Sequence, residues 1–357
     1  LLLGMLVAVI VMLLLPNSGS FGFGYGSLAA LWFGAITVAL LDLSSNVAMQ
    51  PFKMMVGDMV NDNQKSYAYG IQSFLSNIGA VLAAIFPFLL TLLGVSNIAP
   101  KGVVPQSVVI SFYVGAALLV VTSLFTVIRV HEYDPTTYAK YHGISEEDNK
   151  EGGNWLTLLK HAPKAFWTVT LVQFFCWFAF QYLWTYSAGA IAKNVWNTTN
   201  ATSAGYQAAG NWYGVLAAVQ SIAAVVWSYV LAKVPNKYHK LGYAGSLFLG
   251  SLGFISVFFI HSQWALIISY TLIGIAWAGM NTYPLTIVTN ALSGKHMGTY
   301  LGLFNGSICL PQIVASVLSF GLFPLLGNSQ VNMFVLAGIV LLIGALSVGT
   351  IKETYEN

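Results

Sequence analysis

The sequence predicts an all-α membrane protein with about ten transmembrane helices, because it is rich in apolar residues, poor in charge and divided into long apolar segments. Of its 357 residues, 57% are hydrophobic and only 7% carry a charge. A soluble domain carries about 25% charged residues, so this chain lacks the charge to cover a water-facing surface. Its net charge of only +3 also argues against a nucleic-acid partner.

The predicted helices are apolar segments judged against the thickness of a bilayer. A hydrocarbon core of about 30 Å needs about 20 apolar residues in a helix, and the backbone groups in lipid must find partners within the segment. None of the segments alternates with period two in the way a membrane barrel would. The predicted helices cover residues 1–15 (short), 25–56, 70–93, 107–129, 166–192, 208–232, 241–260, 265–290, 299–326 and 331–350.

The lysines and arginines indicate which helix ends face the cytoplasm. If successive segments alternate in direction, all of these residues except Lys101 and Lys193 fall on one side. Cytoplasmic loops carry an excess of Lys and Arg. We therefore expect a multi-pass protein of the cell (inner) membrane whose C-terminus is cytoplasmic.

The longest hydrophilic stretch, residues 130–165, divides the helices into two groups. We expect an N-terminal bundle of four helices over 1–129, a cytoplasmic central loop over 130–165 and a C-terminal bundle of six helices over 166–357. The chain also starts inside an apolar run with no initiator Met and no basic flank. These two observations favour two six-helix bundles of which the first two helices are missing.

Asp42 is the candidate for ion coupling, since it is the only carboxylate deep within a predicted span. An aspartate at the centre of a membrane helix costs about 2.5–3.5 kcal/mol on insertion scales. This cost favours the neutral form, so a change in hydration would let the group load and release a proton. The structural alternative is a hydrogen-bonding group that packs helices. We favour proton coupling because ionisable residues within membranes are functional by default.

Polar residues near Asp42 follow one face of the same helix. Asn46 and Lys53 lie four and eleven residues further on, and Gln50 lies close to this stripe. A polar stripe in lipid must face a cavity or a partner helix. Lys53 is interpreted as an anchor at the cytoplasmic end of the helix, with pairing to Asp58 as the alternative.

Amide and indole side chains form candidate sugar-binding faces in the C-terminal half. A sugar presents hydroxyl groups at its edge and C–H surfaces on its faces, which suit amides and aromatic rings. The alternative is an aromatic belt together with core packing. The candidates are Gln173, Trp177 and Gln181 in segment 166–192, Trp277 and Asn281 in segment 265–290, and Asn305 and Gln312 in segment 299–326.

Prolines and glycines in these segments have structural interpretations. Pro284 and Pro311 interrupt helical hydrogen bonding and free carbonyl groups, which neighbours or a cavity must satisfy. Glycines at GxxxG spacing predict close approach between helices. The glycines concerned are Gly210 and Gly214, and Gly298, Gly302 and Gly306.

Signatures of enzymes, nucleotide sites and metal sites are not found in the sequence. It holds no GxSxG, Walker A or HExxH motif, and its six histidines lie in loops or at helix ends. Cys176 and Cys309 both lie within apolar runs and form no CxxC pair. We therefore expect no enzymatic activity, no cofactor and no metal, and any uphill transport would use an ion gradient.

Two stretches carry a family resemblance. Residues 42–58, DLSSNVAMQPFKMMVGD, resemble the fourth-helix motif of sucrose–proton symporters, which reads approximately D-x-x-x-N-x(4)-P-x-R-x(4)-D. The motif is matched by Asp42, Asn46, Pro51 and Asp58, while Lys53 replaces its arginine. Residues 274–316 resemble the tenth and eleventh helices of the same family, most closely in GTYLGLFN and LPQIVAS. The resemblance is closer to bacterial members than to plant members.

The resemblance implies a major-facilitator fold within the broader glycoside–pentoside–hexuronide–cation symporter group. It also implies proton-coupled uptake of a sugar, a di- or oligosaccharide such as sucrose or maltose. In that family the fourth-helix acid couples the proton, and this position is Asp42 here. The alternatives are a sodium-coupled or exporting carrier of the same fold, a membrane-embedded enzyme or receptor, and a channel.

Overall fold

The computed structural model describes residues 1–17, 27–59, 62–100, 103–131, 134, 137, 155–231, 233–235, 238–291 and 297–351. Side chains are described at these positions except 50–51, 53–59, 62–70, 73–74, 77, 285–286, 289–290, 297–298 and 301. The described residues form helices and no strands, and the chain divides into two compact units, Leu1–Glu151 and Gly152–Asn357. The boundary between the units falls within the stretch predicted as the central loop.

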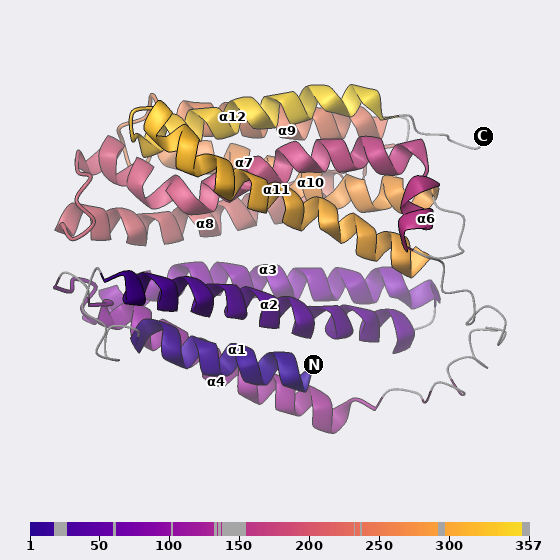
Figure 1. Cartoon of the computed structure of the whole chain (residues 1–357), viewed down its shortest axis with the longest axis horizontal. Helices are drawn as coiled ribbons and strands as arrows, with labels where there is room; N and C mark the ends of the chain where they lie inside the picture. Colours follow the sequence, from indigo (N-terminus) through magenta and orange to yellow (C-terminus); the bar gives the residue numbers. More distant parts are fainter. Residues whose placement is uncertain are drawn as a thin grey trace. The chain divides into compact units, whose positions relative to one another are not determined.

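The described part of the first unit (Figure 1) includes the helices α1 (Leu2–Leu14), α2 (Leu28–Met59), α3 (Asp62–Leu92) and α4 (Gln106–Arg129). α1 packs against both α2 and α4, and α3 packs against α4. Gly4 lies at the crossing of α1 and α2, where a Cβ would lie 2.8 Å from the carbonyl oxygen of Ser44. A glycine therefore lets these two backbones approach closely.

The second unit is arranged around α7. Its elements are α6 (Trp155–Lys160), α7 (Lys164–Trp196), α8 (Ala204–Leu231), α9 (His239–Ser256), α10 (Leu266–Ala291), α11 (Met297–Leu325), α12 (Gln330–Ser347) and a 3₁₀ turn, Val348–Thr350. α7 packs against α8, α10, α11 and α12, and α9 packs against α10 and α12. Val172, Cys176, Ala179 and Leu183 of α7 are fully buried. The core of this unit thus follows α7.

The ends of several helices follow from local sequence. Prolines immediately precede α4 and α7, where the missing N–H is not needed. α7 ends at Asn197, which adopts the left-handed conformation (φ 47°) that asparagine tolerates. At the start of α12, the hydroxyl of Ser329 accepts a hydrogen bond from the backbone N–H of Asn332 at 3.3 Å.

Each of the ten predicted segments contains a helix in the described residues. α7 begins at Lys164 and α8 at Ala204, earlier than predicted, because a helix starts at its cap while hydropathy marks only its apolar part. The central loop predicted over 130–165 contains the short helix α6. α6 packs against α11, and the hydroxyl of Tyr300 donates to the carbonyl of Leu158 at 3.1 Å.

Several of the described helices are suited to a membrane. Trp32, Val121 and Phe320 are 59%, 64% and 84% exposed, and such apolar surface suits lipid. Two further apolar helices, Leu2–Asn17 and Ile78–Leu92, have fewer than 18 residues. The predicted count of ten spans stays a prediction. Among the described residues, six helices are long and apolar enough to span: Leu28–Met49, Gln106–Arg129, Lys164–Trp196, Ala204–Leu231, Gly302–Leu325 and Gln330–Thr350.

The close helix approaches found among the described residues involve glycines outside the GxxxG patterns. Among the described residues, nothing lies within 4 Å of the place a Cβ would take at Gly210, Gly302 or Gly306, so close helix approach at these three stays a prediction. A Cβ at Gly253 of α9 would instead lie 2.6 Å from the carbonyl oxygen of Ser269 on α10. Glycine spacing marks a smooth helix face, but it does not determine whether a neighbouring helix covers that face.

Gly253→Ala is expected to lower the midpoint of thermal unfolding of the purified chain in detergent. The new methyl group would overlap a backbone carbonyl, which cannot rotate away, and such overpacking costs about 1–3 kcal/mol. Gly245→Ala on the same helix is the matched control, since the space around Gly245 is open among the described residues. It gains about 1 kcal/mol of helix propensity and should not lower the midpoint. Equal destabilisation by both substitutions would contradict the close contact at Gly253.

Candidate functional site

Aromatic side chains of α7 surround one indole of α10. The ring of Trp277 lies 5.7 Å from Trp177, 6.1 Å from Trp184 and 5.1 Å from Phe180, measured between ring centroids. Its contacts with the two tryptophans are edge-to-face, the arrangement that the charge distribution of aromatic rings favours. The three α7 residues recur at three- and four-residue steps and so share a face of that helix.

A proline in α10 explains the contact of Gln173 with that helix. Pro284 has no N–H, so the carbonyl of Met280, four residues earlier, loses its helical donor. The side-chain amide of Gln173 donates to this carbonyl at 2.9 Å. Gln173 is only 4% exposed. It therefore satisfies the carbonyl that the proline frees and ties α7 to α10 at that point.

Three polar atoms on one face of α7 are buried without a partner among the described residues. They are the hydroxyl of Thr170, the side-chain oxygen of Gln173 and the indole nitrogen of Trp177. A buried polar atom without a hydrogen bond costs about 1–3 kcal/mol. The atoms of Gln173 and Trp177 are an acceptor and a donor one helical turn apart, which matches the hydrogen-bonding ability of a hydroxyl group.

The other candidate amides of the second unit make different contacts. Gln181 donates from its side chain to the hydroxyl of Ser316 on α11 at 3.2 Å. The side-chain amides of Asn281 and Gln312 donate to carbonyls one turn earlier on their own helices, at 2.7 and 3.0 Å. Asn281 is exposed, while Asn305 on α11 is half-buried. The structure thus joins Gln173, Trp177 and Trp277 most directly.

Asp42 lies on α2 within the apolar span Leu28–Met49, and its side chain is exposed. Asn46 donates from its side chain to the backbone carbonyl of Asp42 at 2.9 Å, and so does not engage the carboxylate through this bond. The carboxylate therefore lies on an open side of its helix. Three further residues of the predicted stripe have side chains outside the described ones: Gln50, Lys53 and Asp58.

Acidic side chains are absent from the sequence between residues 152 and 352. The described residues also contain no group of three or more His, Cys, Asp or Glu side chains that could hold a metal ion. The absence of a metal and of a cofactor stays a prediction. We call the surface formed by Gln173, Trp177 and Trp277 the α7–α10 face. It can offer neutral amide groups and aromatic rings to a ligand.

Sequence inspection missed several participants in this region. Phe180 contacts Trp277, and the hydroxyl of Tyr182 donates to the carbonyl of Ala315 on α11 at 3.0 Å. No sequence signal predicts these contacts, because they depend on how the helices pack. The carbonyl of Met280 had a signal, since Pro284 marks the residue four positions before it.

The sequence matches the Major Facilitator Superfamily over residues 1–316. The chain belongs to this superfamily. Its membership and its transporter structural neighbours indicate a transporter and not an enzyme. The fold is consistent with secondary transport by alternating access.

Solved structures of major facilitator transporters share this fold. A bacterial homologue of the human lysosomal transporter Spinster is 15% identical with a TM-score of 0.63, over 99% of this chain and 82% of the other. The xylose transporter XylE from E. coli is 13% identical with a TM-score of 0.61, over 96% and 79%. A POT family transporter in complex with a thioalcohol-conjugated peptide is 13% identical with a TM-score of 0.63, over 97% and 80%. At these identities the likeness shows the fold alone. No curated protein sequence matches the chain.

In this major facilitator protein, Gln173 is expected to stabilise the fold only while Pro284 is present. Gln173→Leu leaves the Met280 carbonyl without a donor and should cost about 1 kcal/mol, within the range of hydrogen bonds between membrane helices. In a Pro284→Ala background the alanine N–H can bond to that carbonyl, so the same substitution should cost less. Thermal unfolding of the four proteins in detergent measures this coupling.

Gln181→Leu provides the control for this cycle. Its amide binds the hydroxyl of Ser316 and not the carbonyl freed by the proline. Its effect on the unfolding midpoint should therefore be the same with and without Pro284. If Gln173→Leu lowers the unfolding midpoint by the same amount with and without Pro284, the pairing of Gln173 with the freed carbonyl is rejected.

Proposed function

We propose that the protein is a secondary active transporter that takes up a sugar together with protons by alternating access. The proposal adds substrate and coupling ion to the transporter fold of the superfamily. The observation that carries it is Asp42, an exposed carboxylate within an apolar span.

The position of Asp42 restricts what its carboxylate can face. A charged aspartate at the centre of a span costs about 2.5–3.5 kcal/mol in lipid, so the group takes up a proton or faces water or a partner. A carrier that alternates between such environments loads and releases a proton in each cycle. The C-terminal unit has no Asp or Glu up to residue 352 that could replace it.

The α7–α10 face supports a neutral, hydroxyl-rich substrate. The unpaired oxygen of Gln173 and N–H of Trp177 suit a hydroxyl group, and the Trp277 ring suits the C–H face of a sugar. The solved neighbours have different substrates, since one carries xylose and another binds a conjugated peptide. The choice of a di- or oligosaccharide such as sucrose or maltose therefore rests on this face and on the resemblance of residues 42–58 to sucrose–proton symporters.

The remaining candidates complete the proposal. Lys53 and Asp58 form a gate or anchor at the cytoplasmic end of α2, in an inner-membrane protein with a cytoplasmic C-terminus. Further amides supply hydrogen bonds to the sugar. These are Asn46, Gln50, Gln181, Asn281, Asn305 and Gln312.

Asp42→Asn is expected to abolish uphill sugar accumulation and to leave sugar exchange in place, because asparagine cannot carry the proton. One proton entering at 100 mV supplies about 2.3 kcal/mol, or about fiftyfold accumulation. With the variant, the sugar concentration inside the vesicles should rise only until it equals the concentration outside. Uptake of labelled sucrose, maltose and glucose into energised proteoliposomes measures this.

Ser45→Ala is the control, because Ser45 is also exposed and lies three residues after Asp42 on α2. This variant should accumulate sugar normally. Addition of sugar to de-energised cells should also make the medium more alkaline. Full accumulation by Asp42→Asn would reject the coupling role of this residue. Sugar uptake that follows sodium without any alkalinisation would identify the sodium-coupled alternative.

Trp277→Leu is expected to raise the half-saturating sugar concentration for exchange about tenfold, since loss of an aromatic face removes about 1.4 kcal/mol of contact. Trp264→Leu is the control, because Trp264 is 64% exposed and pairs with Trp212 outside this face. Exchange measured over a range of sugar concentrations separates affinity from maximal rate. Equal effects of both substitutions would argue against a sugar at Trp277.

A further inference from the structure

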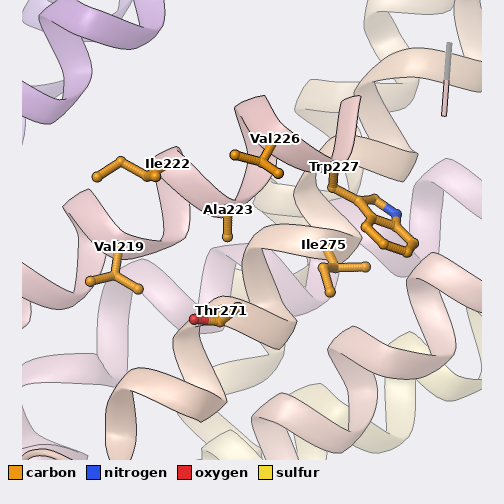
Figure 2. A pocket seen from close by; sticks show the side chains of 7 residues that line it. All are labelled: Val219, Ile222, Ala223, Val226, Trp227, Thr271 and Ile275. Carbon is orange, nitrogen blue, oxygen red and sulfur yellow. The ribbon is translucent and has the colours of Figure 1, made fainter. Parts of the chain in front are cut away.

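An open apolar pocket lies between α8 and α10 (Figure 2). Its volume is about 310 Å³. It is lined by Ile222, Val226 and Trp227 from α8 and by Thr271 and Ile275 from α10, among others. Ile222 and Val226 are 53% and 60% exposed, so the second unit itself leaves this pocket uncovered.

The pocket and the α7–α10 face, where we propose that the sugar binds, lie on different sides of α10. Trp277 and Met280 of α10 contact α7, whereas Thr271 and Ile275 line the pocket. On α8, Trp227 donates from its indole to the hydroxyl of a serine on α9 at 2.9 Å. The pocket therefore lies where α8 and α10 meet, toward α9 and away from α7.

A cation lies beyond the pocket lining, near the end of α8. Along α8, the exposed stripe of Ile222 and Val226 continues through Tyr229, which is 66% exposed, to Lys233. Ile222, Val226 and Tyr229 recur at steps of four and three, so they follow one side of α8, while Lys233 lies in the turn after Leu231, where the helix ends. The ammonium of Lys233 lies 4.2 Å from the centroid of the Tyr229 ring. This contact holds the charge beside the apolar stripe.

The sequence around Lys233 carries positive charge and no carboxylate. The chain has no Asp or Glu from residue 152 to residue 352, while Lys240 and His239 stand at the start of α9, the next helix. A negatively charged lipid headgroup would complement the charge of this lysine.

The length of the stripe matches one leaflet of a bilayer. At about 1.5 Å per residue, Tyr229, whose ring contacts Lys233, lies about 15 Å along α8 from Val219 of the pocket lining. Half of a bilayer's hydrocarbon core is about 15 Å, so with Lys233 at the headgroup level the pocket reaches the middle of the bilayer. We propose that the pocket binds an acyl chain of an anionic phospholipid and that Lys233 binds its phosphate.

The test measures the lipid retained by the full chain after purification in detergent. The protein is mixed with equal amounts of 1-palmitoyl-2-oleoyl phosphatidylglycerol and phosphatidylcholine, and bound lipid is identified by native mass spectrometry. One lysine near an anionic headgroup favours it about fivefold, so the wild type should retain phosphatidylglycerol about fivefold over phosphatidylcholine. Lys233→Gln should lose this preference. Lys193→Gln, at an exposed lysine of α7, should keep it.

A second substitution tests the acyl part of the site. Val226→Trp fills the pocket from an exposed position and should reduce retention of both lipids several-fold, whereas Val225→Trp, on the same helix but outside the pocket lining, should not. Lys233→Gln changes only a surface side chain, so it decides the test even where a tryptophan variant fails to fold. Unchanged preference in Lys233→Gln, unchanged retention in Val226→Trp, or retention of detergent alone by the wild type would overturn the proposal.

Discussion

A backbone carbonyl inside a bilayer needs a hydrogen-bond partner, and one carbonyl of α10 obtains it from another helix. Pro284 removes the donor of Met280, and Gln173 of α7 supplies a replacement at 2.9 Å. Leaving that acceptor unsatisfied would cost about 1–3 kcal/mol. The same bond holds the Gln173 side chain beside Trp177 and leaves its oxygen unpaired. A structural requirement of the helix thus positions a polar group on the candidate sugar face.

The sequence could predict the helices because apolar length and the scarcity of charge are properties of each segment alone. It could also predict that Gln173 and Trp177 share a face of α7, since that follows from helical spacing. It could not predict that Gln173 reaches Met280 or that Trp277 lies against Trp177, because these contacts depend on which helices meet. The glycines show the same limit. Gly302 has the right spacing for a contact but no described neighbour, while Gly253 lies outside any GxxxG pattern and touches α10.

The two units differ in the chemistry that they offer. Asp42 supplies an ionisable group in the first unit, whereas the second unit has no carboxylate up to residue 352. In the proposed function, the proton binds Asp42 in the first unit and the sugar binds the uncharged α7–α10 face of the second unit. Coupling between proton and sugar then requires that each ligand bind one conformation of the carrier more tightly than the other. The coupling energy then appears as a shift in the populations of these conformations.

α10 belongs to both of the sites that the second unit offers. Trp277 and the Met280 carbonyl face α7, while Thr271 and Ile275 line the pocket beside α8. The helix contains Pro284, and a proline removes one of the hydrogen bonds that keep a helix straight. A change in the path of α10 would alter both surfaces together. A lipid that fits the pocket better in one such arrangement would favour the sugar affinity of that arrangement, and the bound sugar would favour the lipid by the same factor.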